Sequence, residues 1–527
     1  MRHLNDFTLF TLLAALVLPA CASDSLRSAS DDDDDWNNES GAFDDDDDEA
    51  PGNNDSNDND DPEEEDDFLS TEPRGTDVFV FVANPERDTV SKIDAWTRDI
   101  ETIEVGDEPT QVLVSSDYLR AVTFNASDDS VSVIDVNTGV VTDLDVREDF
   151  NFIQMSPDGR WVAAYFNAGL EGAEFDINGV RSFTEVSFVD TIEKRVESYS
   201  VGFNPKQIQF TAASDRAVII SDSFLTVASL DVTPIALDLV DLGADPVDPP
   251  VAAEVEVTGS GDWAFIRYHG FDSIQAVQLQ TGQLGELDGG LNPTDLDLSP
   301  DGTQAIVVAR DSSELRIFDA VDPLGIVPEV VLTPIESTIG SLVLAPSGDL
   351  GLLFTTAVLE DRITFWDRTT DTLTTRRLEK PVEAVAISPD GGSALIIHTL
   401  EDAPGENDIF TSRYALTVVD LSTWLTNPVG LQSRPIRWTT SNDGRYSMFI
   451  MENNRNVGVI DYATRLVDDL IVPSQPVHIG MMPLESDPED ALGWVSQEHE
   501  LGRISFIEPY SLSVETVTGF ELNSNID

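Results

Sequence analysis

Seven polar residues, two of them histidines, occupy similar positions in the chain, each at or just after the end of a short apolar run. They are Asn125, Asn167, Asp222, His269, Arg310, His398 and Glu452. Imidazole nitrogens beside carboxylates can ligate a metal ion or exchange a proton. A histidine at a strand end is more often simply solvated. We therefore treat the seven residues as a candidate binding face and assign no catalytic group and no metal ligand among them.

The motifs of common enzyme classes are missing from the sequence. No GxSxG, HExxH, GxGxxG or P-loop occurs. The chain has one cysteine, Cys21, so an internal disulfide, a thiolate metal site and a CxxCH haem attachment are all impossible. Tryptophans such as Trp161 and Trp366 fall on strand positions, where packing explains them better than a cofactor platform does. We expect no cofactor.

The charge of the chain narrows the class of partner. The 99 acidic residues outnumber the 29 lysines and arginines, which gives a formal net charge of −70. Proteins that bind nucleic acid neutralise phosphates with lysine and arginine. No nucleic-acid partner is therefore expected.

The first 20 residues have the features of an export signal. Arg2 and His3 precede an apolar run over 7–18, which is too short to span a bilayer but suits a signal peptide. The sequence Leu18-Pro19-Ala20-Cys21 that follows resembles the bacterial lipobox. The resemblance implies cleavage before Cys21, lipidation of its thiol, and anchoring to a membrane of the cell envelope, with the outer membrane favoured and either its periplasmic or its surface side open. The alternative is an ordinary secretory signal with an incidental cysteine.

Residues 21–70 read as an acidic linker. Residues 31–67 carry about 21 acidic residues and no lysine or arginine. Such a segment buries too little apolar surface to offset the entropy lost on ordering, so we expect it to be disordered. Calcium could bind the oxygen-rich clusters at 44–48 and 58–61, but the EF-hand spacing is missing. A solvated spacer is the favoured interpretation.

Two signatures repeat from residue 75 onward. The first is a turn between two apolar strands, with clear copies at Ser156-Pro157-Asp158-Gly159, Ser299-Pro300-Asp301-Gly302, Ser388-Pro389-Asp390-Gly391 and Ser441-Asn442-Asp443-Gly444. The second is an alternating strand that ends on an acidic or amide residue, at Asp94, Asp135, Asp190, Asp231, Gln278, Asp319, Asp367, Asp420, Asp461 and Glu508. These ten positions recur about every 41 to 55 residues, the spacing of propeller blades. We interpret the acidic residues as caps of the turns they open.

Each unit reads as four short strands. The clearest unit has expected strands at 296–299, 305–309, 315–319 and 330–333. Four strands per repeat predict an all-β propeller of four-stranded blades over 71–527, and the turns resemble those of the YVTN and WD40-like propeller repeats of exported bacterial proteins. Ten units can form one large ring or two smaller rings, or reflect irregular segments wrongly divided, so seven to ten blades are expected. The first complete strand, near Val78, needs an inner neighbour, which 68–71 or 520–522 could supply.

Insertions mark one face of the expected ring. Two lie between second and third strands, at 167–183 and 400–413, and a third lies between an outer and an inner strand, at 243–250. Loops on a rigid repeat scaffold are common binding surfaces, although neutral drift can also lengthen them. The expected function is a binding scaffold for a protein, glycan or peptide. The alternatives are a propeller hydrolase or lactonase with a site in the central funnel, and a structural envelope component.

Overall fold

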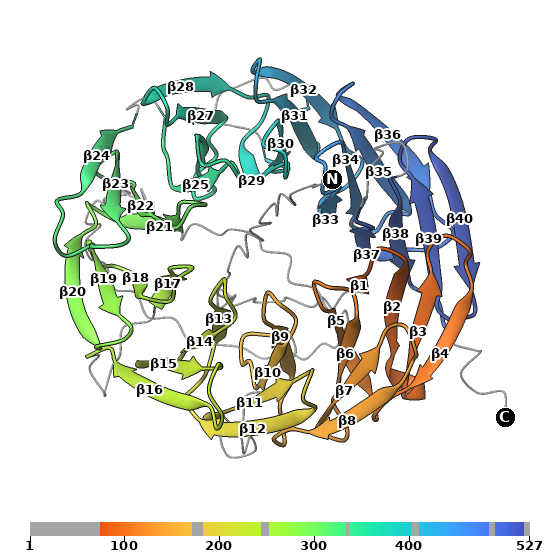
Figure 1. The fold of residues 1–527 in the computed structure, drawn as a ribbon. Coiled ribbons are helices and arrows are strands. Elements are labelled where there is room, and N and C mark those ends of the chain that lie inside the picture. Colours follow the sequence, from red (N-terminus) through yellow and green to blue (C-terminus); the bar gives the residue numbers. More distant parts are fainter. Residues whose placement is uncertain are drawn as a thin grey trace, which may run out of the picture.

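The computed structural model describes residues 74–170, 183–243, 252–333, 337–401, 410–483 and 491–520. Ten four-stranded antiparallel sheets stand around one axis as the blades of a single propeller (Figure 1). The prediction of an all-β propeller with ten units is therefore confirmed, and the alternative of two tandem rings is wrong. The expected signal peptide, Cys21 and the acidic linker lie outside the described residues.

The inner strands line the axis, and each begins a blade. They are β1 (Arg74–Gly75), β5 (Pro109–Val114), β9 (Phe152–Met155), β13 (Gln207–Phe210), β17 (Ala252–Val257), β21 (Pro293–Leu298), β25 (Ser341–Leu344), β29 (Val382–Ile387), β33 (Pro435–Thr440) and β37 (Pro476–Met481). Four of them, β5, β21, β33 and β37, begin on a proline at a register shift, which suits a sheet edge because proline donates no hydrogen bond.

The second strands are apolar almost throughout because both faces of each are covered. They are β2 (Phe79–Asn84), β6 (Arg120–Asn125), β10 (Trp161–Tyr165), β14 (Arg216–Ile220), β18 (Trp263–Tyr268), β22 (Gln304–Ala309), β26 (Leu350–Phe354), β30 (Ser393–His398), β34 (Tyr446–Met451) and β38 (Gly493–Gln497). A continuous apolar run is typical of a strand buried on both sides.

The third strands are buried in the same way. They are β3 (Thr89–Asp94), β7 (Ser130–Asp135), β11 (Glu185–Asp190), β15 (Phe224–Ser229), β19 (Ser273–Gln278), β23 (Glu314–Asp319), β27 (Arg362–Asp367), β31 (Ala415–Asp420), β35 (Asn456–Asp461) and β39 (Arg503–Glu508). A 3₁₀ turn at Pro85–Arg87 joins β2 to β3. The described residues contain no helix that is long and apolar enough to cross a membrane.

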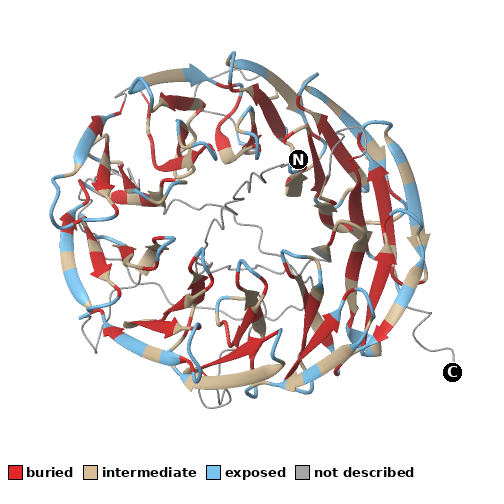
Figure 2. Cartoon of the chain, in the orientation of Figure 1, coloured by how far each residue is buried: buried red, intermediate tan, exposed pale blue. Residues whose placement is uncertain are grey.

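The outer strands form the rim, and most of their residues are partly buried or exposed (Figure 2). They are β4 (Ile100–Glu104), β8 (Val141–Asp145), β12 (Arg195–Ser200), β16 (Ala236–Asp241), β20 (Gln283–Asp288), β24 (Glu329–Leu332), β28 (Thr372–Arg377), β32 (Leu425–Gly430), β36 (Leu466–Ile471) and β40 (Ser513–Thr518). The four expected strands of blade 6 correspond to β21, β22, β23 and β24, with ends that differ by at most three residues.

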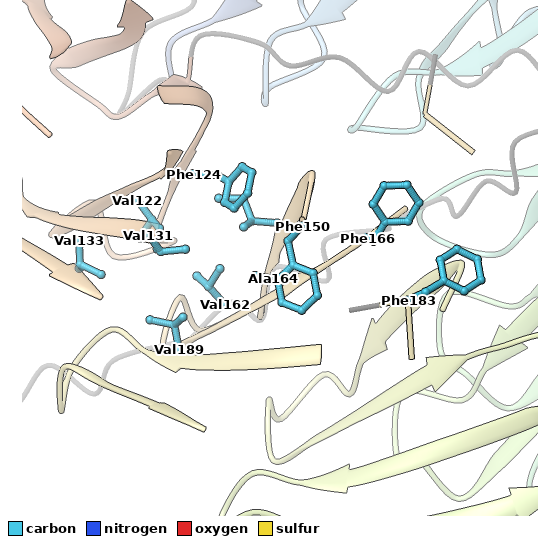
Figure 3. Packing of buried hydrophobic residues seen from close by; sticks show 11 residues of the cluster. Val122, Phe124, Val131, Val133, Phe150, Val162, Ala164, Phe166, Phe183 and Val189 are labelled. Carbon is cyan, nitrogen blue, oxygen red and sulfur yellow. The ribbon is translucent and has the colours of Figure 1, made fainter. Parts of the chain in front are cut away.

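Apolar packing between neighbouring blades forms the core. One buried cluster lies at each blade-to-blade interface, so the core is a ring of ten small cores. Between blades 2 and 3, for example, Val122 and Phe124 pack against Val162 and Ala164 (Figure 3). Neighbouring residues of one strand serve opposite interfaces, because successive side chains point to opposite faces of a sheet.

Side chains join inner strands of neighbouring blades that share no backbone ladder. Gln209 donates to Val255 O at 2.6 Å and accepts from Val257 N at 2.9 Å. Asp295 accepts from Leu342 N at 2.6 Å in the same manner. These bonds satisfy backbone groups at the buried edge of a sheet, which would be costly to leave unpaired.

The ring closes without a strand shared between the two ends of the chain. β1 directly precedes β2 and pairs with it through Arg74 and Gly75, so the expectation that 68–71 or 520–522 would supply this strand is wrong. Thr76 Oγ1 accepts from Phe79 N at 2.7 Å and stabilises the turn that makes the early pairing possible. Blade 10 keeps four strands of its own, and packing between blades 10 and 1 closes the ring.

The repeated turns lie on one face, which we call the turn face, and their polar residues act locally as expected. Ser299 Oγ donates to Asp301 Oδ1 at 2.6 Å and accepts from Gln304 N at 3.0 Å. Asp135 Oδ1 accepts from Thr138 N and Thr138 Oγ1 at 2.9 and 2.8 Å. Hydrogen bonds from the Thr138 side chain lower the pKa of Asp135. The prediction that these acidic residues cap turns is confirmed for Asp94, Asp135, Asp190, Asp319, Asp367, Asp420 and Asp461.

Candidate functional site

The opposite face, here called the insertion face, carries the loops from second to third strands and from outer to inner strands. Within a blade the two kinds of loop are joined by backbone hydrogen bonds. Asp222 N donates to Phe203 O at 3.1 Å, Arg310 N to Asn292 O at 3.1 Å, and Glu452 N to Arg434 O at 2.8 Å. At these three blades, backbone hydrogen bonds therefore hold the described parts of the two loops together.

The expected insertions connect the elements that the sequence indicated. β10 ends at Tyr165 and β11 begins at Glu185; β30 ends at His398 and β31 begins at Ala415; β16 ends at Asp241 and β17 begins at Ala252. All three connections lie on the insertion face. Residues 171–182, 244–251 and 402–409 within them lie outside the described residues.

Two of the seven candidate residues are enclosed within their blades. Asn125 Nδ2 donates to Ser130 Oγ at 2.9 Å and to Ser132 Oγ at 2.8 Å. His398 Nδ1 lies 3.1 Å from Pro381 O, and its Nε2 lies 2.7 Å from Thr417 Oγ1. Both side chains are fully buried. They hold the second strand to its neighbours, so we do not include them in a binding surface.

The chemistry of His398 follows from this enclosure. Burial lowers its pKa to about 4, so the ring is neutral at pH 7. His269 lies on blade 5 and His398 on blade 8, each at its own strand end. The structure therefore does not bring the two histidines together.

Asn167 is also mostly buried and has a structural position. Its backbone N donates to Asn151 Oδ1 at 2.7 Å, and its Oδ1 accepts from Gly169 N at 2.9 Å. The residue thus fixes the start of the insertion after β10.

The other four candidate residues reach the surface of the insertion face. Asp222 pairs with Lys206 at 2.9 Å, and His269 and Glu452 are exposed. Partial burial and the nearby charge of Arg267 lower the pKa of His269. Asp222, His269 and Arg310 lie on the consecutive blades 4, 5 and 6, whereas Glu452 lies on blade 9. The structure therefore groups three of the seven residues.

Apolar side chains that the sequence analysis did not single out accompany these three. Phe203 packs edge-on against Phe183 with ring centroids 4.7 Å apart, yet 44% of it remains exposed. Phe271 packs against Tyr268 at 6.0 Å and is 49% exposed, and Leu291 is exposed on the next loop. We call the surface formed by these residues the recognition band: Phe203, Asp222, His269, Phe271, Leu291 and Arg310. An aromatic residue three positions beyond a strand end was the sequence signal available for it.

A buried lysine anchors the insertion after β30. Lys380 is fully buried, and its Nζ donates to Leu400 O at 3.0 Å and to Phe410 O at 3.4 Å. A buried ammonium group is costly unless it is hydrogen-bonded. The two ends of the insertion are therefore tied to the core through this one side chain, which sequence analysis did not identify.

Comparison with known proteins bears on the fold alone. No family model matches the chain, and no curated protein matches its sequence. A solved structure of a eukaryotic initiation factor is similar, with a TM-score of 0.50 and 9% identity over 72% of this chain and 93% of that one. The dihydro-heme d1 dehydrogenase NirN gives a TM-score of 0.43 and 11% identity, covering 78% of each chain. The propeller domain of Cps50 (Swd1) from Myceliophteria thermophila gives 0.33 and 14%, covering 63% and 99%.

The enclosure of His398 predicts a pH dependence of stability. In the unfolded chain this histidine titrates near 6.5, whereas the folded protein keeps it neutral to about pH 4. The unfolded state therefore binds more protons in this window, and the free energy of unfolding should fall by about 3 kcal/mol as the pH drops from 7 to 4. His398→Gln should remove this contribution, because glutamine does not titrate. Glutamine fits a position of this kind, since Gln497 makes the equivalent bond in blade 10, from Nε2 to Ser505 Oγ at 2.7 Å.

Urea unfolding of wild type and variant across pH 4–7 measures the difference. His499→Gln, at a half-buried histidine on another loop of the same face, is the control and should leave the wild-type slope in place. An identical slope in wild type and His398→Gln would contradict the assignment.

Proposed function

We propose that the chain is an extracytoplasmic, lipid-anchored binding scaffold that takes up a segment of a protein or a peptide on the recognition band. The observation that carries the proposal is the pair of exposed phenyl rings, Phe203 and Phe271, held on hydrogen-bonded loops. Exposed aromatic side chains on a rigid platform lose little entropy on binding and are enriched at the centres of interfaces.

The polar groups of the band suit a peptide. Asp222, which pairs with Lys206, and Arg310 lie on either side of blade 5, and exposed His269 lies between them in blade order. Such groups can pair with a peptide backbone or with charged side chains, while the phenyl rings take apolar ones. A glycan is the alternative ligand for the same surface, because sugars also use aromatic faces and polar rims.

The hydrolase interpretation would rely on His269 and His398, which lie on different blades in the described part of the chain and so do not form one site. The proposed anchor is supported by the lipobox-like sequence at 18–21 and by the absence of any other cysteine in the chain. Several acyl chains give stable attachment, whereas one gives only marginal binding.

Replacement of the band phenyl rings tests the binding proposal. The double variant Phe203→Ser/Phe271→Ser should lose at least tenfold in affinity for peptides selected from a phage-displayed library on the wild type. The matched control is Leu119→Ser/Ile192→Ser, which removes two similarly exposed apolar residues from the turn face and should bind unchanged. Equal peptide affinities of the two double variants would exclude the recognition band as the binding surface. Binding of glycans but of no peptides on parallel arrays would show that the ligand is a glycan.

Replacement of the single cysteine tests the anchor. In a Gram-negative host the wild-type chain should fractionate with membranes and require detergent for extraction, whereas Cys21→Ser should appear in the soluble fraction. A wild-type chain that is soluble after signal cleavage would show an ordinary secretory signal instead.

A further inference from the structure

A long connection between β23 and β24 crosses the outside of the ring and reaches the neighbouring blade. We call residues 321–328 the rim strap. Asp319 Oδ1 accepts from Val321 N at 2.8 Å, and Trp263 Nε1 of blade 5 donates to Val321 O at 3.1 Å. Leu324 lies so close to Gly285 of β20 that a Cβ there would come within 2.1 Å of it. The strap is therefore held in place by contacts to both blade 5 and blade 6.

The strap and β24 nevertheless present aliphatic side chains to solvent. Val327 is 88% exposed and Leu332 is 72% exposed, and Val321, Ile326 and Val330 are exposed as well. A hollow of about 360 Å³ lies beside them, between β20 and the strap, with Leu287, Phe318, Leu324 and Val330 in its lining. A concentrated apolar patch on a chain of this charge marks an interaction surface.

After its first residue, Glu329, β24 also lacks the charged residue or proline that the other rim strands carry. Each of the other nine has a charged residue or a proline after its first position, as with Asp143 in β8, Pro428 in β32 and Asp468 in β36. β24 has Val330, Val331 and Leu332 there. Charged residues and prolines on an edge strand prevent another strand from pairing with it, so β24 is the rim strand that remains open to pairing.

The charges around the hollow indicate what can pair there. Glu286, Asp288, Asp322 and Glu329 are exposed near its rim. The one cation of the lining, Arg316, already pairs with Glu314 at 2.7 Å and with Asp288 at 3.1 Å. The surface is thus apolar at its centre and acidic at its margin, which favours a basic partner over a second copy of this acidic chain.

We propose that β24 and the rim strap bind an extended aliphatic segment that carries lysine or arginine, as a fifth strand of blade 6. The backbone of the segment pairs with the free edge of β24. Its aliphatic side chains cover Val330 and Leu332 and enter the hollow, and its cations lie near Glu286, Asp288 and Glu329. This surface is separate from the recognition band, so either proposal can fail alone.

The probe is a fluorescein-labelled peptide of alternating valine and lysine, titrated against the full mature chain and followed by anisotropy. Val330→Thr/Leu332→Thr places β-branched, strand-forming residues at both positions but removes the apolar surface, and it should raise the dissociation constant at least tenfold. The matched control, Leu466→Thr/Ile471→Thr on β36, changes two equally exposed rim residues and should bind as the wild type does.

Three companion measurements make the proposal falsifiable. A peptide with serine in place of valine should bind at least tenfold more weakly, and so should one with a central proline, because the first lacks apolar side chains and the second cannot pair along its length. Equal binding of the serine peptide would show that the interaction is only a non-specific charge attraction, and this would overturn the proposal. Self-association of the wild type in sedimentation velocity, abolished by Val330→Thr/Leu332→Thr, would also overturn it, because the surface would then serve a second copy.

Discussion

Apolar packing between the faces of neighbouring blades is the interaction on which the rest of this structure depends. No backbone ladder joins one described blade to the next, so each sheet is held by the two clusters that flank it. Side chains such as Gln209 and Asp295 add bonds between inner strands, where a sheet edge would otherwise be buried unpaired. Burial of apolar area stabilises such interfaces by roughly 25 cal/mol per Å², and this term rather than edge pairing closes the ring.

The same constraint determines where recognition can occur. The second and third strands are committed to packing on both faces, which leaves loops and rim strands for binding. On the insertion face, hydrogen bonds between loops hold Phe203 and Phe271 in place without covering them. On the rim, the strap covers part of β20 while leaving Val327 and β24 exposed. The two proposed surfaces therefore use loops and a rim strand, which are parts of a blade that the core does not require.

The fold could be predicted from the sequence because the sequence signals of this fold are local. The Ser-x-Asp-Gly turns and the acidic caps such as Asp135 act within a few residues, so their spacing gave ten repeat units and an expectation of seven to ten blades. The site was harder to predict, because a strand end is equally compatible with exposure and enclosure. His398 and Asn125 are buried by neighbouring strands, while His269, at nearly the same position, is exposed. Lys380 and the rim strap depend on contacts between segments distant in sequence or on different blades, which no local pattern reveals. The inner strand of blade 1 was missed because it has only two residues.

The interface between blades 10 and 1 joins the first and last described blades without a shared strand. Phe506 is buried there, with Arg98 stacked on its ring at 4.3 Å and paired with Glu515 at 3.0 Å. Hydrogen exchange of Phe506→Ala, followed by mass spectrometry, examines this interface directly, with Phe265→Ala between blades 5 and 6 as the control. Packing-based closure predicts faster exchange in β2 and β3 of blade 1 as well as in β38 and β39 of blade 10. Faster exchange confined to blade 10 would contradict it.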